Sequence, residues 1–422
     1  MRKAPYTPPR RPSIRTFEEP RLRFPNTYSG ATLLASLSTL HFLAEKQKSK
    51  EIILDFSNSR HVLESGMLPL IPIINRHVAR RNVKFQLILP KDEKVASQFR
   101  KCNWAHLIDP THYEYDEDAT ITHCPALRFR NSSEQAKAVN KILNVILTST
   151  GITRDVLKAI EWSLNEITDN VLNHAKAGAG YVQATWFREN NIMEFVVADA
   201  GIGIPASLRE NNHAIALERA IQEGVTRNKQ TNQGNGLYGS YRIASIGKGQ
   251  FSIQSHYGHL YLRQNGDVRI MPTKIPYIGT TVRWNIRTDV EGLLAKALVF
   301  KGQPHEPSFD FIDRISKEGD QSVDVILKEM FPSLGSRDAG SSVHQYLRNI
   351  LVMDESVTVN VNFRDINIVS SSFADEVFGK LFVEFGPMSF MKRIQLIEVE
   401  PDILRLIDRA IIQRSAHSGS TA

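Results

Sequence analysis

Short apolar runs alternate with helical patterns in the first 125 residues. The segments EIILDF (51–56) and VKFQLILP (83–90) are rich in β-forming residues, so each is predicted to be a buried strand. Between them SGMLPLIPIINRHVARR (65–81) has helical periodicity with an irregular, proline-containing first turn, and DEKVASQFRKC (92–102) predicts a shorter helix. Strands that alternate with helices indicate a mostly parallel sheet.

The C-terminal part of the chain repeats this order. VTVNVNF (357–363) and RIQLIEVE (393–400) predict strands. SFADEVFGKLFVEF (372–385) and PDILRLIDRAIIQR (401–414) predict helices, and the second begins with a proline that suits a first turn.

The spacing from late strand to next helix is also the same in the two regions. It is ten residues from Asp55 to Ser65 and ten from Asn362 to Ser372. The shared order and spacing suggest two copies of one small fold.

A polar stripe runs along a helical pattern in the middle of the chain. Thr153 is predicted to cap this helix, and NEITDNVLNHA (165–175) places Glu166, Asn170 and His174 four residues apart on one face. A carboxylate there can deprotonate a water or a hydroxyl group, and a carboxamide oxygen can ligate Mg²⁺. Ordinary solvated helices show the same spacing, so surface decoration stays an alternative.

A strand, EFVVAD, ends at Asp199 and leads into Gly201 and Gly203. A buried carboxylate at this point can accept a hydrogen bond from an exocyclic amine, such as that of adenine. The glycines allow the backbone to turn tightly against a ligand. Further along, Gly279 and Thr280 open a predicted terminal strand, VRWNI.

A polar, glycine-bearing loop precedes an apolar helix between these two strands. It enters the helix through Gly234, Gly236 and Leu237, where backbone N–H groups suit phosphate oxygens. The loop has the composition of a mobile lid, although an ordinary surface loop is the alternative. Its candidate phosphate contacts are Thr226, Arg227 and Lys229.

These four motifs occur in a fixed order: Glu-x₃-Asn, Asp-x-Gly-x-Gly, Gly-x-Gly-Leu and Gly-Thr. As a set, over residues 131–290, they resemble the four boxes of the GHKL ATPase superfamily, which joins gyrase, Hsp90, histidine kinases and mismatch-repair ATPases. The resemblance implies an α/β sandwich, a mixed sheet with helices on one face, and ATP bound with Mg²⁺ between helices and lid.

The resemblance also implies a role for each motif residue. Glu166 becomes the general base and Asn170 the Mg²⁺ ligand. The first box continues to His174 and so resembles anti-sigma-factor serine kinases more than gyrase; a structural role at the helix end is favoured for this histidine over a phosphate contact. The remaining ATP contacts are Asp199 with Gly201 and Gly203 at adenine, Thr280 beside it, and Gly234, Gly236 and Leu237 at the phosphates, below a lid that contains Thr226 and Lys229.

The two flanks resemble STAS domains, the anti-anti-sigma-factor fold, in which a serine pair followed by glycine opens a helix. The C-terminal string Ser-Ser-Ser-Phe-Ala-Asp resembles further the STAS-like domain of unknown function that is fused to ATPase modules in bacteria. Glu64 replaces the first serine of the N-terminal copy, and Phe373 replaces the glycine of the C-terminal copy. Phosphoacceptor and helix-capping roles therefore both stay open. The serines concerned are Ser65, Ser371 and Ser372.

The expected fold class is α/β (α+β), with a central GHKL α/β sandwich between two small STAS-like domains. The expected divisions are a basic, proline-rich tail (1–24), a STAS-like domain (25–125), the GHKL domain (126–290), a linker (291–304) and a C-terminal STAS-like domain (305–422).

Composition adds few constraints. A chain of 422 residues that is 41% apolar can form several cores. Cys102 and Cys124 fit neither a disulfide framework nor a metal spacing, and no apolar run approaches the ~20 residues that cross a bilayer, so a cytoplasmic protein is predicted. The net charge of +7 lies largely in the tail, which is expected to be solvated or to contact nucleic acid or an acidic partner.

Three activities are compatible with the predicted pocket. A histidine kinase is disfavoured because residues 126–165 contain no histidine. The preferred hypothesis is an ATPase that acts as a regulatory switch through protein partners of its flanks, with association of protomers into a homodimer. The alternatives are a serine kinase of the anti-sigma type and a scaffold that binds ATP without turnover. Transcription control and bacterial defence both use such modules, and the sequence does not choose between them.

Overall fold

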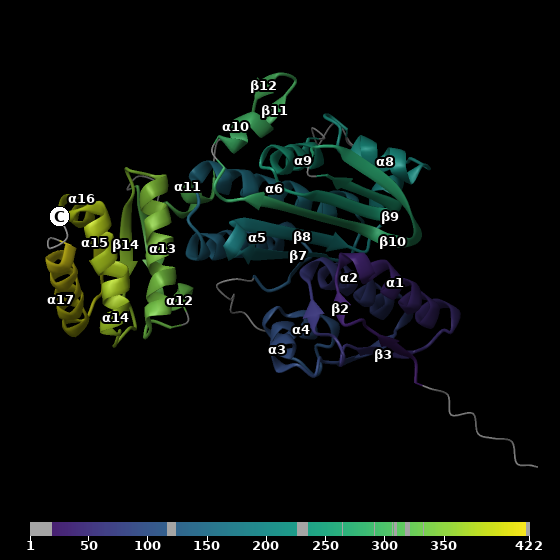
Figure 1. Cartoon of the computed structure of the whole chain (residues 1–422), viewed down its shortest axis with the longest axis horizontal. Helices are drawn as coiled ribbons and strands as arrows, with labels where there is room; N and C mark the ends of the chain where they lie inside the picture. Colours follow the sequence, from purple (N-terminus) through teal and green to yellow (C-terminus); the bar gives the residue numbers. More distant parts are fainter. Residues whose placement is uncertain are drawn as a thin grey trace, which may run out of the picture.

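The computed structural model describes residues 19–115, 124–225, 235–263, 265–290, 292–305, 307, 310–316, 321–331 and 333–418. Most of the predicted basic tail, residues 1–18, lies outside this range. The described residues form three successive α/β units (Figure 1), so the predicted fold class is confirmed.

The N-terminal unit contains a three-stranded parallel sheet in the order β1-β3-β5. The strands predicted at 51–56 and 83–90 are confirmed as β3 and β5, and the helix between them is confirmed as α2. Its prolines, Pro69 and Pro72, lie inside the helix and not in its first turn as predicted. A short parallel pair, β2 with β4, lies outside this sheet. The elements are β1 (Arg21–Arg23), β2 (Thr27–Tyr28), α1 (Gly30–His41), the π-helical turn η1 (Phe42–Lys46), β3 (Glu51–Asp55), β4 (His61–Val62), α2 (Glu64–Arg81), β5 (Lys84–Ile88), α3 (Glu93–Lys101) and α4 (Trp104–Ile108).

The C-terminal unit also has a parallel sheet of three strands in consecutive order, β13-β14-β15. This common topology supports the inference of two copies of one small fold. The elements are α11 (Phe311–Ile315), β13 (Ser322–Ile326), α12 (Leu327–Met330), α13 (Arg337–Met353), β14 (Thr358–Asn362), α14 (Ser371–Ala374), the π-helical turn η3 (Asp375–Gly379), α15 (Lys380–Phe385), α16 (Pro387–Arg393), β15 (Ile394–Ile397) and α17 (Pro401–Ser418).

The central unit is built on a five-stranded sheet in the order β6-β7-β8-β10-β9. Every neighbouring pair is antiparallel, so the expectation of a mixed sheet is wrong for the described strands. The elements are β6 (Leu127–Phe129), α5 (Ser132–Ser149), α6 (Arg154–His174), β7 (Gly180–Phe187), η2 (Arg188–Asn190), β8 (Ile192–Asp199), α7 (Gly203–Leu208), α8 (His213–Ala220), α9 (Gly236–Ile246), β9 (Phe251–Leu262) and β10 (Val268–Arg287).

Helices cover both faces of this central sheet. Side chains alternate between the faces of a strand. Val182 and Val197 accordingly join the core with α5 and α6, whereas their neighbours Tyr181 and Val196 join the core of the N-terminal unit. Helices α1 and α2 pack against that second face, below the sheet in Figure 1. The sequence predicts helices on one face of this sheet, whereas the structure has helices on both faces.

The segment expected to be a linker, 291–304, contains ordered structure. Its described part forms α10 (Leu293–Ala297) and a hairpin of β11 (Val299–Phe300) with β12 (Gln303–Pro304). The Asp155 carboxylate, at the start of α6, accepts the backbone N–H of Leu293 at 2.6 Å and so holds α10 against α6.

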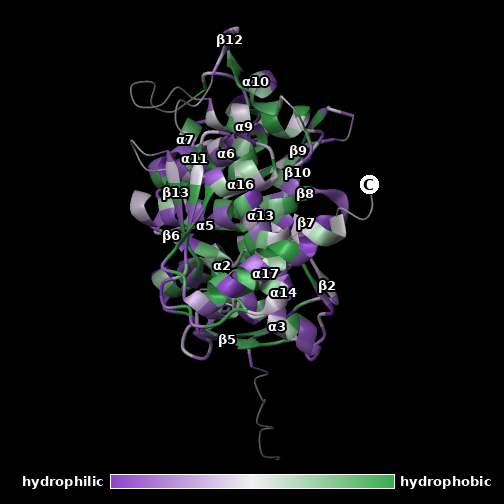
Figure 2. Cartoon of the chain, turned by 90° about the vertical axis from the view of Figure 1, so that its left-hand side faces the viewer, coloured by the Kyte–Doolittle hydropathy of each residue, from purple (hydrophilic) through white to green (hydrophobic). Residues whose placement is uncertain are grey.

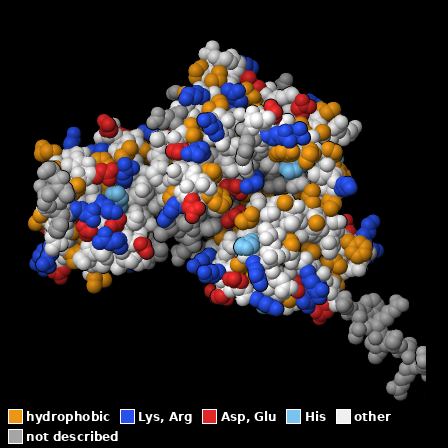
Figure 3. Space-filling view, in the orientation of Figure 1, with side chains coloured by type: hydrophobic (Ala, Val, Ile, Leu, Met, Phe, Trp, Pro, Cys, Tyr) orange, Lys and Arg blue, Asp and Glu red, His pale blue; other side chains and the backbone are white. Residues whose placement is uncertain are grey.

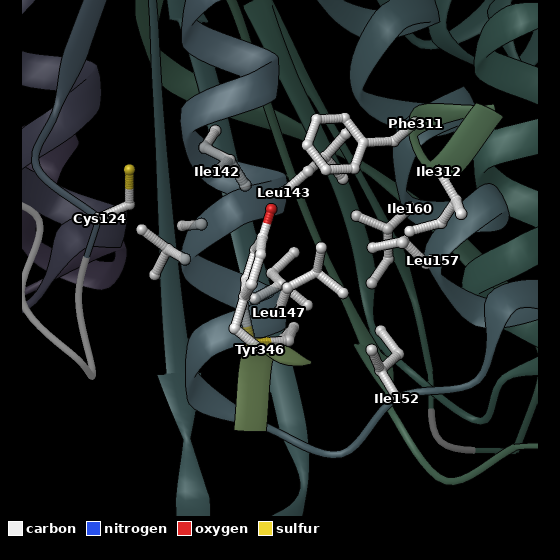
Figure 4. Close-up of a cluster of buried hydrophobic side chains, with 14 of the residues drawn as sticks. Cys124, Ile142, Leu143, Leu147, Ile152, Leu157, Ile160, Phe311, Ile312 and Tyr346 are labelled. Atoms are coloured by element: carbon white, nitrogen blue, oxygen red, sulfur yellow. The ribbon is translucent and has the colours of Figure 1, made fainter. Parts of the chain in front are cut away.

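The core of the central unit continues into the C-terminal unit. Helix α13 packs on α5, and Figure 4 shows Tyr346 beside Leu143 and Leu147 of α5. The Asn349 side-chain amide donates to the carbonyls of Leu147 and Thr150, both at 2.8 Å. These contacts fix one unit on the other.

The longer helices carry hydrophilic and hydrophobic residues side by side (Figure 2), as helices with one packed face do. Within the described part of the chain, no helix is both long and apolar enough to span a bilayer.

Candidate functional site

A cavity of about 390 Å³ lies between α6, the turn after β8 and the start of α9. This volume is within the range of small-molecule pockets. Residues from all four sequence motifs line it: Glu166, Asn170, His174, Asp199, Gly203, Gly236, Leu237 and Thr280. Gly201 lies in the adjoining turn. The predicted phosphate contacts Thr226, Arg227, Lys229 and Gly234 lie outside the described residues.

Helix α6 supplies one wall of the cavity. The helix begins as predicted, because the Thr153 hydroxyl accepts the backbone N–H of Val156. Apolar side chains such as Leu164 anchor it in the core. The polar stripe that begins at Glu166 therefore faces the cavity, and surface decoration does not describe it.

The Glu166 carboxyl is desolvated beside a like charge. Burial, and secondarily the negative charge of Asp169, raise its pKa to about 7. No hydrogen bond to this carboxyl is found among the described residues, so its oxygens can accept from a ligand. Gly236 approaches so closely that a Cβ atom there would collide with the Glu166 carboxylate. Glycine at the start of α9 thus allows helix and carboxylate to meet.

The Asp199 carboxyl lies at the end of β8 with only 2% of its surface exposed. It accepts the backbone N–H of Gly201 at 2.7 Å, and the backbone N–H of Thr280 also donates to it. Burial raises its pKa to about 7, and these two N–H groups partly oppose that effect. Asp199 and Thr280 are direct partners across β8 and β10, which explains why two distant motifs reach one point.

The turn after Asp199 is held in an unusual conformation. Gly203 has φ of +75°, a region that residues with a Cβ rarely adopt. The Ser255 hydroxyl accepts the backbone N–H of Ile204 at 3.0 Å and donates to the carbonyl of Gly279 at 2.7 Å. Ser255 thereby joins the second and fourth motifs, a role that the sequence did not reveal.

Two parts of the chain match known family models. Residues 156–289 match the histidine kinase-, DNA gyrase B- and HSP90-like ATPase family, over the residues that form this cavity. The central unit is a GHKL-type ATP-binding domain. Residues 340–404 match the STAS-like domain of unknown function (DUF4325). These matches do not extend to the N-terminal unit, whose STAS-like character stays a prediction, and no curated protein matches the chain.

The oxygen donors of the GHKL domain fit Mg²⁺. Asn170 was predicted as its ligand, and the carboxylate of Asp169 and the carboxamide of Asn173 line the same cavity. Hard oxygen atoms of this kind are the ligands that Mg²⁺ prefers. Asp169 and Asn173 are one helical turn from Glu166 and Asn170, so the i, i+3 spacing was the signal that could have found them.

A second wall of the cavity was not predicted from the sequence. Phe300 and His305 line it, and they come from the hairpin that follows the GHKL motifs. The Phe300 ring lies 6.2 Å from that of Trp162, between centroids. The backbone N–H of Lys301 donates to the Glu223 carboxylate at 2.6 Å. Nothing in the sequence of a presumed linker indicated these contacts.

The N-terminal unit holds the turn after Asp199 from the other face of the sheet. The Arg76 guanidinium of α2 donates to the carbonyl of Ala200 at 2.8 Å. The Tyr277 hydroxyl lies 3.1 Å from the carbonyl of Pro69 and 3.2 Å from that of Asp199. Helix α2 therefore contacts the backbone of the predicted adenine site directly.

The three candidate phosphoacceptor serines lie away from the cavity. Ser65 belongs to α2, which lies across the central sheet from α6. Its hydroxyl accepts the backbone N–H of Gly30 at 3.3 Å. Ser371 and Ser372 begin α14 in the C-terminal unit, far from α9 in Figure 1. The helix cap there is Ser370, which accepts the backbone N–H of Phe373 at 3.0 Å.

Proposed function

We propose that this protein binds ATP with Mg²⁺ in the cavity, hydrolyses it, and uses the nucleotide state to regulate its flanking units. One observation carries this proposal: a buried carboxylate from β8, a carboxylate and carboxamide from α6, and the glycine start of α9 meet at one cavity. In this arrangement Asp199 accepts the adenine amine, and Asn170 with its oxygen-bearing neighbours holds Mg²⁺, which neutralises phosphate charge when bound.

The Glu166 carboxylate acts as the general base. With a pKa raised to about 7, it is substantially ionised at neutral pH and basic enough to accept a proton from a water molecule. The start of α9 lines the same cavity, and the backbone N–H groups at a helix start favour negative charge on phosphate oxygens.

Helix α6 supports coupling to the C-terminal STAS-like domain. Its second half carries Glu166, and its first half contacts α11. The Glu161 carboxylate accepts the backbone N–H of Phe311 at 2.8 Å, and Arg154 pairs with Asp310 at 2.7 Å. A change in α6 with the nucleotide state would therefore change the support of this domain.

Serine phosphorylation is the second candidate, because activation of a serine hydroxyl requires the same base. The positions of Ser65, Ser371 and Ser372 favour a serine on another chain as the acceptor over these three in cis. A scaffold that binds ATP without turnover is the third candidate. The ionisable Glu166, whose carboxyl has no hydrogen-bond partner within the part of the chain that the structure describes, favours turnover over a scaffold.

Partners of the flanks are part of the proposal. Met388 and Met391 are 85% and 73% exposed and share one face of α16, which suits an apolar protein contact. Basic and acidic side chains are interspersed on the face of Figure 3, which favours a protein partner or a second copy of the chain over nucleic acid. A reducing cytoplasm fits Cys102 and Cys124, which are buried free thiols.

The experiment that tests the proposal is incubation with γ-labelled ATP and Mg²⁺, with free phosphate and labelled protein measured separately. Glu166→Gln should lower phosphate release at least about 100-fold, because general bases contribute about 10²–10⁴-fold, while ATP binding by calorimetry persists. Glu189→Gln is the matched control, since Glu189 is exposed beyond the far end of β7. Label on a serine would indicate the kinase, and normal turnover by Glu166→Gln would refute the assigned base.

A further inference from the structure

Two histidines and a glutamate gather in the N-terminal unit, where the end of α1 meets the last turns of α2. His41 ends α1, Glu45 lies in the π-helical turn η1, and His77 lies in α2. One ligand atom from each lies within 4.8 Å of the other two. None of these side chains takes part in the cavity of the GHKL domain.

Three ring nitrogens of this cluster are buried and have no hydrogen-bond partner among the described residues. Both ring nitrogens of His41 and Nε2 of His77 are shielded from solvent and make no hydrogen bond among the described residues. His77 is only 3% exposed, and its ring centroid lies 5.4 Å from that of His41. Native proteins rarely leave buried polar nitrogens unsatisfied, so each such case points to a missing partner.

The surroundings of the rings suit a cation. Burial lowers the pKa of His41, and burial together with the neighbouring His41 lowers the pKa of His77. Burial thus disfavours the protonated rings, and imidazole nitrogens are common ligands of metal ions.

We propose that His41, Glu45 and His77 form a binding site for a divalent transition-metal ion, with Zn²⁺ as the best match. Two imidazoles and one carboxylate are a donor set that Zn²⁺ uses with water in the fourth position. Mg²⁺ and Ca²⁺ prefer oxygen ligands throughout. π-Helical turns such as η1 are frequent at functional sites.

The three side chains must close slightly around an ion. Zn²⁺ bonds of about 2.0–2.2 Å place tetrahedral donor atoms about 3.3–3.6 Å apart. Glu45 is the ligand with room to move, because its side chain is 40% exposed. Its present neighbour is Arg81, whose guanidinium lies 3.6 Å from the carboxylate and would compete with the ion.

A bound ion would join α1 to α2 beside a contact that already reaches the nucleotide cavity. Arg76 precedes His77 and donates to the carbonyl of Ala200. The site would therefore stabilise the helix that supports the Asp199 turn. The metal proposal itself does not depend on ATP binding or hydrolysis.

The test is equilibrium dialysis of the full chain against Zn²⁺ without nucleotide, followed by elemental analysis, and the visible spectrum after Co²⁺ loading. Wild type should retain one tightly bound Zn²⁺ and show the intense bands of four-coordinate Co²⁺. His41→Gln with His77→Gln should lose this site by at least about 100-fold in affinity, since even indirect partners of a metal site contribute about 10–100-fold. His61→Gln, an exposed histidine of the same unit, should match wild type.

Two single variants guard against loss of folding. Glu45→Gln changes a partly exposed side chain and should weaken Zn²⁺ binding at least tenfold with an unchanged circular dichroism spectrum. Arg81→Gln should strengthen it, because the competing cation is removed. The proposal is overturned if wild type retains no Zn²⁺, or if the double histidine variant or Glu45→Gln retains it with wild-type affinity.

Discussion

At the scale of single residues, the proposed chemistry of the GHKL domain depends on two buried carboxyls that must both be ionised. In this proposal Glu166 loses its proton to act as a base, and Asp199 accepts a hydrogen bond from the adenine amine. Burial raises the pKa of both to about 7. In the ATP complex, a hydrogen bond from adenine would favour the ionised form of Asp199 and leave Glu166 as the group that titrates.

We therefore expect the pH dependence of kcat and kcat/KM to differ. The value of kcat should fall about tenfold for each pH unit below the Glu166 pKa of about 7. The value of kcat/KM, which reports the free enzyme, should fall more steeply because Asp199 also becomes protonated. Initial rates measured from about pH 5.5 to about pH 9, a range that spans the transition, would give kcat and kcat/KM.

Asp169→Asn provides the internal control for this profile. Burial is the main cause of the raised pKa of Glu166, and this variant removes the negative charge that adds to it, so the fall in kcat should begin at lower pH. An unchanged profile would mean that another group titrates in the reaction.

Asp199→Asn should weaken ATP binding at least about tenfold. The charge-assisted hydrogen bond is lost, and the carboxamide NH₂ of the variant and the adenine amine are both donors. The carboxamide can instead donate to the carbonyl of hypoxanthine, so the preference should move from ATP toward ITP. Calorimetric titration with the two nucleotides measures this ratio. An unaltered ratio of the two affinities would mean that the adenine ring binds away from Asp199.

The same variant tests the burial of this carboxyl. The folded state holds the Asp199 proton more tightly than the unfolded chain does, since its pKa is raised from 3.8 to about 7. Its contribution to the free energy of unfolding is therefore present at low pH and is lost as pH rises between these values. The melting temperature of nucleotide-free Asp199→Asn should accordingly fall less between pH 5 and pH 8 (roughly this window) than that of wild type.

At the scale of elements, the hairpin β11–β12 extends the site beyond the residues with GHKL motifs. Phe300 packs near Trp162 and lines the cavity. Phe300→Ala should raise the dissociation constant of ATP about 3–10-fold, the loss expected for a half-buried aromatic contact. Titration of a fluorescent ATP analogue would measure it. Phe187→Ala, at an exposed phenylalanine of β7, should have no effect, and equal losses in both variants would exclude a specific role for the hairpin.

Local patterns were enough to predict many of these elements, but not their assembly. The strand ending at Asp199 and the helix capped by Thr153 follow from short-range alternation, capping and periodicity, and the structure confirms both. That Thr280 faces Asp199 depends on strand pairing over a long sequence separation, which local residues do not encode. For the same reason, the contacts of Phe300 and of Arg76 with the site could not be predicted.

At the scale of the whole molecule, the three units are joined through shared cores. The N-terminal unit covers one face of the GHKL sheet, and the C-terminal unit extends the core on the other side through α13 and α5. The predicted domains follow one another along the chain, but the units do not pack as separate bodies, because they share cores. Nucleotide-dependent movement of α6 or of the Asp199 turn would be transmitted through packed side chains to both flanks.

This arrangement leads to a prediction about a fragment that lacks the N-terminal unit. Tyr181, Val196 and Tyr277 are at most 3% exposed beneath α1 and α2. A chain that begins at residue 124 would expose this apolar face and lose the Arg76 and Tyr277 contacts to the Asp199 turn. It should self-associate and bind a hydrophobic dye, because exposed apolar surface drives association. It should also show at least about tenfold weaker ATP binding, because each lost contact at the turn costs about 1 kcal/mol or more.

A chain that begins at residue 19 is the control and should behave as wild type in size-exclusion chromatography and calorimetry. If the shorter chain stayed monomeric with full ATP affinity, the N-terminal unit would be an accessory module and not a structural half of the nucleotide site.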